Sequence, residues 1–396
     1  MSKRKRSATG GRRQGPGGAR DVLLALPSLR DLPVWGDLSP SERQRADFTR
    51  MRETLASTGD MKREELFLGC VVCLDRGFPA VLFEGGVVRA EFAAQLTKSG
   101  FSRIAVADWV CLRIVPEHEV AQAVGIVLRE NDIARWRGGS RGERQTLAAN
   151  VDLVLVVQPL GGGDGSAGLA RIARSALVAA DCHARIAVVL TKADRLDVEG
   201  IVRAVAGVRE LLGDGVPVVV TSAADVAREC ESRGEAVRAL GASWGLDGVR
   251  ELVPKGTVSI VLGESGAGKS TVLNRILGYD VLKTGAVRGR DGAGRHTTVA
   301  RRMVRLPGGG VIVDEPGLRS LPLVGHERGL AALFPEVARV AQECRFRDCT
   351  HTHEPGCAVR RALFDGTCEK ARVDAWVALA AEMRTGASSL DPDVVL

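Results

Sequence analysis

A glycine-rich loop in the last third of the chain constrains the fold more than any other segment. The apolar run at residues 257–262 predicts a buried strand, and a helical pattern follows at residues 269–277. A loop between such a strand and helix surrounds a β-phosphate with backbone N–H groups, while its lysine neutralises phosphate charge and its serine binds Mg²⁺. We therefore expect a mononucleotide-binding α/β domain with a Ser270 magnesium ligand, and nucleotide contacts from Gly263, Glu264, Ser265, Gly266, Ala267, Gly268, Lys269, Ser270 and Thr271.

A second motif, Thr191-Lys192-Ala193-Asp194, follows a predicted strand at residues 186–190. At a strand end in an open α/β sheet, the carboxylate can accept the ring N–H and the exocyclic amine of guanine, and the lysine stem can cover the base. The loop at Ser222 and Ala223 adds a backbone N–H for the base oxygen. Threonine stands where asparagine is usual, so we expect weaker bracing of the loop. Because this motif precedes the phosphate loop, whereas ordinary GTP-binding domains have the opposite order, the chain has the motif order of a circularly permuted GTPase.

Two further segments fit the same nucleotide site. Asp314 follows a predicted strand, where its carboxylate can bind Mg²⁺ through water, and Gly317 offers an N–H to a γ-phosphate. An ordinary turn is the alternative for this segment, because it also contains Pro-Gly. Residues 289–298 are rich in glycine and end in Thr297 and Thr298. Such a segment is typical of a switch whose threonine hydroxyl binds Mg²⁺ only while the γ-phosphate is present.

The region before these motifs alternates short apolar runs with turns. Five short strands at near-regular spacing predict an OB-like β-barrel, with strands at residues 66–74, 78–83, 87–92, 109–115 and 125–128. A helix with a serine cap is expected near residues 39–55. From residue 150 onward, strands alternate with helices, which indicates a parallel sheet.

Cysteine and histidine gather near the C-terminus in the pattern Cys344-x₄-Cys349-x-His351-x₅-Cys357. Three thiolates and one imidazole predict a closed tetrahedral zinc site, which would stabilise a short, loop-rich segment. His353 is an alternative to His351, and reduced thiols without metal are the alternative to the site itself. A helical end at residues 373–383 follows the cluster.

The net charge of +7 comes from the N-terminal tail. Residues 1–20 contain seven Lys and Arg and no acidic residue, so the remaining 48 basic residues (55 minus 7) balance 48 acidic ones. We expect a disordered tail that binds phosphate backbones or only aids solubility. No apolar run reaches the roughly 20 residues of a membrane helix, and the tail lacks the core of a signal peptide. Nine unevenly spaced cysteines indicate reduced thiols or metal ligands. The expectation is a cytoplasmic protein without a membrane partner.

Together these motifs resemble the ribosome small subunit-dependent GTPase A family, and the Gly-Arg-His-Thr-Thr sequence at residues 294–298 is among the more specific pieces. The resemblance covers roughly residues 62–370. It implies a circularly permuted GTPase with an N-terminal OB domain and a C-terminal zinc domain. It also implies slow GTP hydrolysis that the 30S subunit stimulates strongly during late maturation of that subunit.

The resemblance also bears on individual residues. It favours His351 over His353 as the zinc ligand. Leu318 occupies the place where many GTPases have a water-orienting glutamine, so His296 is the candidate replacement, acting with Lys269. An exposed loop histidine without a catalytic role is the alternative for His296.

We therefore expect a multidomain protein. Its expected parts are a disordered basic tail (1–20), an N-terminal extension (21–61), an OB-like β-barrel (62–135), an α/β P-loop GTPase domain with circularly permuted motif order (136–325) and a small zinc-binding helical domain (326–396). The expected ligands are GTP or GDP, Mg²⁺ and one structural Zn²⁺. The expected function is GTP hydrolysis in late assembly of the 30S subunit, by a monomer that binds rRNA. The alternatives are a GTP-binding RNA-interaction module without significant turnover and a metabolic P-loop kinase, which the guanine motif opposes.

Overall fold

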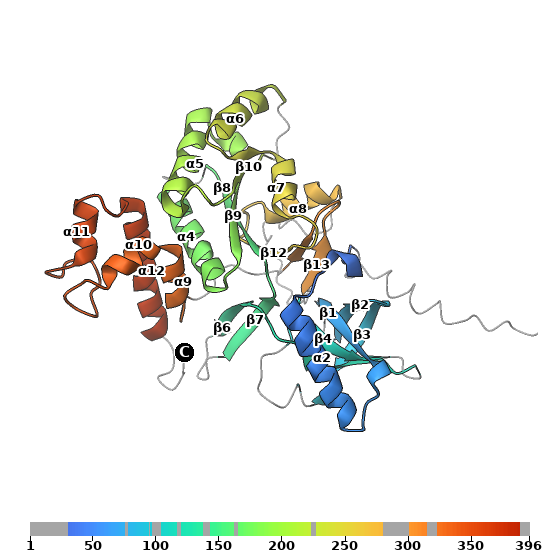
Figure 1. The fold of residues 1–396 in the computed structure, drawn as a ribbon. Coiled ribbons are helices and arrows are strands. Elements are labelled where there is room, and N and C mark those ends of the chain that lie inside the picture. The colour runs from blue at the N-terminus through green and yellow to red at the C-terminus, as the bar shows by residue number, and fades with distance from the viewer. Residues whose placement is uncertain are drawn as a thin grey trace, which may run out of the picture.

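The structure is a computed structural model that describes residues 31–75, 78–94, 96, 104–116, 120–137, 143–161, 165–222, 227–279, 301–314 and 323–388. These residues form a β-barrel, an α/β domain and a helical C-terminal domain, in that order along the chain (Figure 1). The predicted multidomain architecture is confirmed. The basic tail at residues 1–20 lies outside the described residues. No helix in the described ranges is long and apolar enough to cross a membrane.

Five strands close into the barrel. They are β1 (Leu66–Asp75), β2 (Phe78–Phe83), β3 (Gly86–Phe92), β4 (Trp109–Arg113) and β5 (Ala121–Ile126). The strand order is β1-β2-β3-β5-β4, and the antiparallel pairing of β4 with β1 closes the ring. β3 and β5 pair in parallel, as expected for a five-stranded Greek-key barrel of the OB type. The predicted OB-like barrel is confirmed, although β5 begins earlier than the predicted strand at residues 125–128.

The α/β domain is a twisted sheet with helices on both faces. Its strand order is β11-β10-β9-β8-β12-β14-β13, and all neighbours are parallel except β13 with β14. The strands are β8 (Leu153–Pro159), β9 (Arg185–Thr191), β10 (Val218–Val220), β11 (Ser243–Trp244), β12 (Val258–Leu262), β13 (Arg301–Arg305) and β14 (Val311–Asp314). The helices are α4 (Ser166–Asp181), α5 (Val198–Leu212), α6 (Ala227–Ala239), α7 (Leu246–Leu252) and α8 (Lys269–Leu277).

Alternation along the strands divides the core into two layers. On β8, Val154 and Val156 belong to the same buried cluster as Ile172 of α4 and Val205 of α5. The intervening β8 residues, beginning with Leu153, belong to the cluster that includes α7 and α8. Because side chains of a strand alternate between the two faces, apolar residues at every position bury both faces of β8. The phosphate-loop helix α8 therefore lies on the opposite face of the sheet from α4.

Backbone pairing joins the barrel to the α/β sheet. The second half of β1 pairs with β13, with Cys73 opposite Arg302 and Leu74 opposite Arg301. The N-terminal segment lies against the same strand, because the Arg305 N–H donates to the Asp31 carbonyl oxygen over 2.8 Å. It then forms α2 (Glu42–Ser57), which Ser41 caps by accepting from the Gln44 N–H at 3.2 Å.

A buried ion pair connects the barrel to the following hairpin, which consists of β6 (Asp132–Arg137) and β7 (Glu143–Ala149). Arg129 donates from two nitrogens to the two carboxylate oxygens of Asp108, each over 2.6 Å. A third nitrogen donates to the Thr146 hydroxyl of β7 over 3.0 Å. The Asp108 side chain is completely buried. This one arginine therefore links a barrel loop with the hairpin.

Short helices form the C-terminal domain: α9 (Glu327–Leu333), α10 (Pro335–Ala341), α11 (Ala358–Phe364) and the longer α12 (Lys370–Ser388). Several polar contacts hold the domain against the α/β domain, among them those of His326 and Arg372. The His326 ring nitrogen lies 2.9 Å from an Asp181 carboxylate oxygen of α4. Arg372 donates to the Leu211 carbonyl oxygen of α5 over 2.9 Å and to Glu336 over 3.0 Å. In Figure 1 this domain lies beside α4 and α5, away from the barrel.

Removing Arg129 should cost far more stability than removing an exposed arginine. Arg129→Met leaves the buried Asp108 carboxylate without its charge partner, so we expect the free energy of unfolding to fall by about 3–5 kcal/mol. Arg203→Met is the matched control, because Arg203 pairs with Glu199 at side-chain exposures of 66% and 77%. It should cost less than about 1 kcal/mol. Urea denaturation measures both values, and similar small losses would refute a structural role for the Asp108 pair.

Candidate nucleotide site and metal centre

Glycine permits the sharp bend between β12 and α8. Gly263 has a φ of +153°, and a Cβ atom there would lie 2.3 Å from the Val157 carbonyl oxygen. Gly268 has a φ of +96° and occupies the N-cap of α8, with a would-be Cβ 3.3 Å from the Thr191 hydroxyl oxygen. Glycine, which has no Cβ atom, tolerates both the positive φ and the close approach of the neighbouring atoms. The loop therefore presents its backbone at the N-terminus of a nine-residue helix, as phosphate loops do.

Lys269 holds its positive charge inside this loop. Its ammonium donates to the carbonyl oxygens of Gly263 at 2.5 Å and Glu264 at 2.8 Å. Asp314 ends β14, where burial raises the pKa of its carboxyl and the positive charges of Arg302 and Lys269 oppose that rise. A carboxylate near the loop lysine is suited to bind Mg²⁺ through water beside bound phosphates.

The guanine motif contacts the phosphate loop directly. The buried Thr191 hydroxyl donates to the Ala267 carbonyl oxygen at 2.5 Å. Lys192, with a φ of +60°, donates from its ammonium to the Gly266 carbonyl oxygen at 2.5 Å. Threonine thus braces the loop at the position where weaker bracing was expected. The guanine motif and the phosphate loop, which are distant in sequence, are thus in direct contact.

Asp194 is oriented by the neighbouring strand. The Ser222 hydroxyl, just past β10, donates to an Asp194 carboxylate oxygen over 2.7 Å, and this bond lowers the pKa of the Asp194 carboxyl. The Ala193 N–H donates to the Thr221 carbonyl oxygen over 3.3 Å, which ties the two loops together. Asp194 is exposed at the rim, so its ionised carboxylate is available to accept hydrogen bonds from a base.

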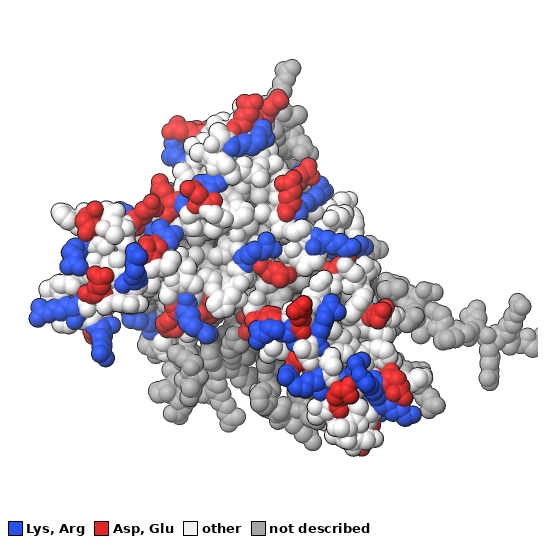
Figure 2. All heavy atoms as spheres, viewed as in Figure 1, with Lys and Arg blue, Asp and Glu red and all other residues white. Residues whose placement is uncertain are grey.

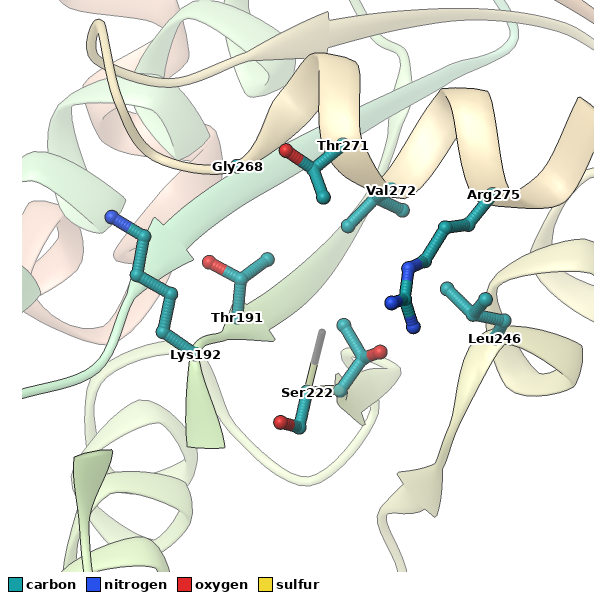
Figure 3. A pocket seen from close by; sticks show the side chains of 9 residues that line it. Thr191, Lys192, Ser222, Leu246, Gly268, Thr271, Val272 and Arg275 are labelled. Atoms are coloured by element: carbon teal, nitrogen blue, oxygen red, sulfur yellow. The ribbon is translucent and has the colours of Figure 1, made fainter. Parts of the chain in front are cut away.

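A pocket opens between these loops and α8 (Figure 3). It is lined by Thr191, Lys192, Thr221, Ser222, Leu246, Gly268, Thr271, Val272 and Arg275. Thr221 belongs to the loop predicted on the guanine side, whereas the sequence did not point to Leu246, Val272 and Arg275 as pocket residues. A helical face running from Thr271 offers a signal for Val272 and Arg275, but nothing local points to Leu246. The predicted residues Ala223, His296, Thr297, Thr298 and Gly317 lie outside the described residues.

The C-terminal cluster brings together four side chains that could hold a metal ion. One donor atom from each of Cys344, Cys349, His351 and Cys357 lies within 4.8 Å of all the others. The Cys344 sulfur is 3.9 Å from the Cys357 sulfur and 3.6 Å from the His351 Nδ1. A tetrahedral zinc ion separates two sulfurs by about 3.8 Å, and sulfur from nitrogen by about 3.6 Å, for Zn–S near 2.3 Å. The donor set and its spacing therefore fit Zn²⁺.

Backbone contacts support this cluster. The Ala358 N–H donates to the Cys344 sulfur over 3.3 Å, and the Arg360 N–H donates to the Cys357 sulfur over 3.4 Å at the start of α11. Such bonds stabilise thiolates, the form that binds metal. His353 lies outside the cluster, with its Nδ1 2.9 Å from the Thr352 hydroxyl oxygen.

Sequence relatives cover most of the chain. A family model described as RsgA GTPase matches residues 126–324. The small ribosomal subunit biogenesis GTPase RsgA of Streptomyces avermitilis is 36% identical over 88% of this chain and 88% of that protein. The protein of the same description from Opitutus terrae is 40% identical over 83% of this chain and 87% of that protein.

Solved structures share the fold. YjeQ from Thermotoga maritima has a TM-score of 0.56 at 23% identity, covering 81% of this chain and 99% of that chain. YloQ, a circularly permuted GTPase, has a TM-score of 0.54 at 20% identity, covering 81% of this chain and 96% of that chain. The predicted permuted order is thereby confirmed. With a family model matching residues 126–324 and relatives at 36% and 40% identity over more than two thirds of its length, the chain belongs to the RsgA GTPase family.

Proposed function

We propose that this protein hydrolyses GTP and acts as a late assembly factor of the small ribosomal subunit. The observation that carries the proposal is the direct contact between the guanine motif and the phosphate loop, through the hydrogen bond from Thr191 to the Ala267 carbonyl oxygen. This contact forms one site with a base end and a phosphate end. The relatives named small ribosomal subunit biogenesis GTPase RsgA supply the cellular process.

The nucleotide roles follow from position. Residues 263–271 bind the phosphates, Lys269 neutralises their charge, and Ser270 and Asp314 hold Mg²⁺. Asp194 reads guanine, with its carboxylate oriented by Ser222. In the segments outside the described residues, the sequence supports a base contact from the Ala223 N–H, γ-phosphate or Mg²⁺ contacts from Gly317, Thr297 and Thr298, and a water-orienting role for His296.

A structural zinc ion is the second expected ligand. Cys344, Cys349, His351 and Cys357 would complete its four coordination positions, leaving none open for a reacting group. The ion would supply stability to a domain of short helices. The zinc ion would therefore stabilise the fold and would take no part in GTP hydrolysis.

The proposed partner is the 30S subunit with its rRNA. Lysine and arginine are interspersed with aspartate and glutamate over the face shown in Figure 2, so the folded body would contact RNA through local patches. Candidates for such a patch surround the metal cluster, where Arg345, Arg347, Arg360 and Arg361 lie close along the chain. We propose a cytoplasmic location, because assembly of the small subunit takes place where its RNA is made and folded. We also propose that the protein acts as a monomer.

A GTP-binding RNA module without turnover is the alternative. Membership of a GTPase family and the intact Lys269 and Ser270 disfavour it. A metabolic kinase is disfavoured by the Asp194 and Ser222 pair, since adenine lacks the two donors that a carboxylate reads in guanine.

Phosphate release from GTP, with and without 30S subunits, tests the proposal. We expect marked stimulation by the subunits, little release from ATP, and a loss of about 100-fold or more in Lys269→Ala, because the variant removes the charge that stabilises the transferring phosphate. Arg203→Met is the control for general effects of a lost positive charge. Unchanged turnover with subunits, despite tight GTP binding, would refute the assembly GTPase and favour the binding module.

Zinc loss should loosen one domain selectively. We expect one zinc per purified chain by elemental analysis, and none in Cys357→Ser, with faster hydrogen exchange in α10 and α11. Cys368→Ser is the matched control, because Cys368 is a buried cysteine of the same domain outside the cluster. It should retain the metal. A Cys357→Ser protein with a full equivalent of zinc would refute the proposed ligand set.

A further inference from the structure

Arg275 lines the nucleotide pocket without an assigned role. It lies on α8 one helical turn beyond Thr271, which also lines the pocket. Four residues of helix advance by about 6 Å, so Arg275 faces a part of the pocket farther from the phosphate loop than Thr271 does. Figure 3 shows its guanidinium extending from α8 into the space beside Leu246, opposite Lys192. Because Thr191, Lys192 and Ser222 of the guanine-side loops line the same pocket, the base would lie at this end of it.

A count of hydrogen-bond donors shows what the base requires there. Guanine presents two donors, N1–H and the exocyclic amine, and two acceptors, O6 and N7. Asp194 is acceptor-only and suits the two donors, whereas the two acceptors need donors from elsewhere. The loop at Ser222 offers O6 one backbone N–H through Ala223 in the proposed site. None of the roles assigned above to the described residues supplies a donor to N7.

Two of the four hydroxyl groups that line the pocket, those of Thr191 and Ser222, already donate their hydrogens. The single hydroxyl hydrogen of Thr191 is donated to the Ala267 carbonyl oxygen, and that of Ser222 is donated to Asp194. An asparagine at position 191 would carry two amide hydrogens, so it could brace the loop with one and donate the other to a base. Threonine braces the loop but has no second hydrogen to give. The substitution of threonine for asparagine thus leaves an acceptor of guanine to be matched by another side chain.

We propose that the Arg275 guanidinium donates to N7 of guanine and, through a second N–H, to the free lone pair of O6. Its planar fork of N–H donors matches these two acceptors, as arginine does when it reads guanine in nucleic acids. The same fork opposes adenine, which carries an amine donor in place of O6. Arg275 is then a second specificity residue, on the opposite edge from Asp194. The inference rests on the proposed reading of guanine by Asp194.

Nucleotide analogues separate the proposed contact of Arg275 with N7 from the proposed contact of Asp194 with the exocyclic amine. Displacement of a fluorescent GDP derivative gives dissociation constants for GDP, for 7-deaza-GDP, which has C–H in place of N7, and for IDP, which lacks the exocyclic amine. We expect the wild-type protein to bind 7-deaza-GDP about tenfold more weakly than GDP, the effect of losing one charge-assisted hydrogen bond. Arg275→Met should bind GDP about tenfold more weakly and no longer distinguish it from 7-deaza-GDP. Its preference for GDP over IDP should persist.

Arg250→Met is the matched control, because Arg250 also contacts α8, by donating to the Ile276 carbonyl oxygen over 3.3 Å, but does not line the pocket. It should keep the wild-type ratio of the GDP and 7-deaza-GDP constants. The same unchanged ratio in Arg275→Met, or a wild type that binds both nucleotides equally, would overturn the proposal. A wild type that does not distinguish GDP from IDP would instead refute the Asp194 assignment, whatever the result with 7-deaza-GDP.

Discussion

The antiparallel pairing of β1 with β13 is the contact on which the arrangement of barrel and nucleotide domain depends. β13 is the last strand of the α/β sheet, and an uncovered edge exposes unpaired backbone groups. Pairing with β1 covers part of that edge and makes one continuous sheet from two domains. β13 begins at Arg301, shortly after the predicted switch at residues 289–298, so the barrel is attached to the strand that follows that segment in the sequence. Displacement of β13 would therefore act on β1.

The permuted order places a second demand on tertiary contacts. The guanine motif and the phosphate loop come from separate stretches of chain, so no short connection sets their distance. The parallel order β9-β8-β12 brings both strand ends to the same edge of the sheet. The bonds from Thr191 and Lys192 to the loop then align the two motifs. Each such bond contributes only about 1 kcal/mol to stability, so their importance lies in geometry.

Elements with a strong local pattern could be predicted, and those formed by pairing could not. The helix predicted at residues 269–277 has the observed bounds of α8, since a glycine precedes it and another follows it. β13 was missed because three of its five residues are arginine, and its conformation depends on neighbours on both sides. β5 starts at Ala121, before the predicted residue 125, because alanine and glutamine favour strands weakly. In β13 and at the start of β5, pairing with neighbouring strands stabilises an extended conformation that the residues themselves favour only weakly.

The same distinction governs the functional sites. Each motif indicated its own chemistry, since a phosphate loop or a Cys/His spacing is a local feature. The partners that orient the motifs were not visible, because they come from the adjacent strand or domain. Ser222 was expected to belong to a loop that offers a backbone N–H, yet its hydroxyl bonds to Asp194 because β9 and β10 end side by side. In this fold, the order of parallel strands decides which locally encoded groups meet, and therefore how selective the nucleotide site can be.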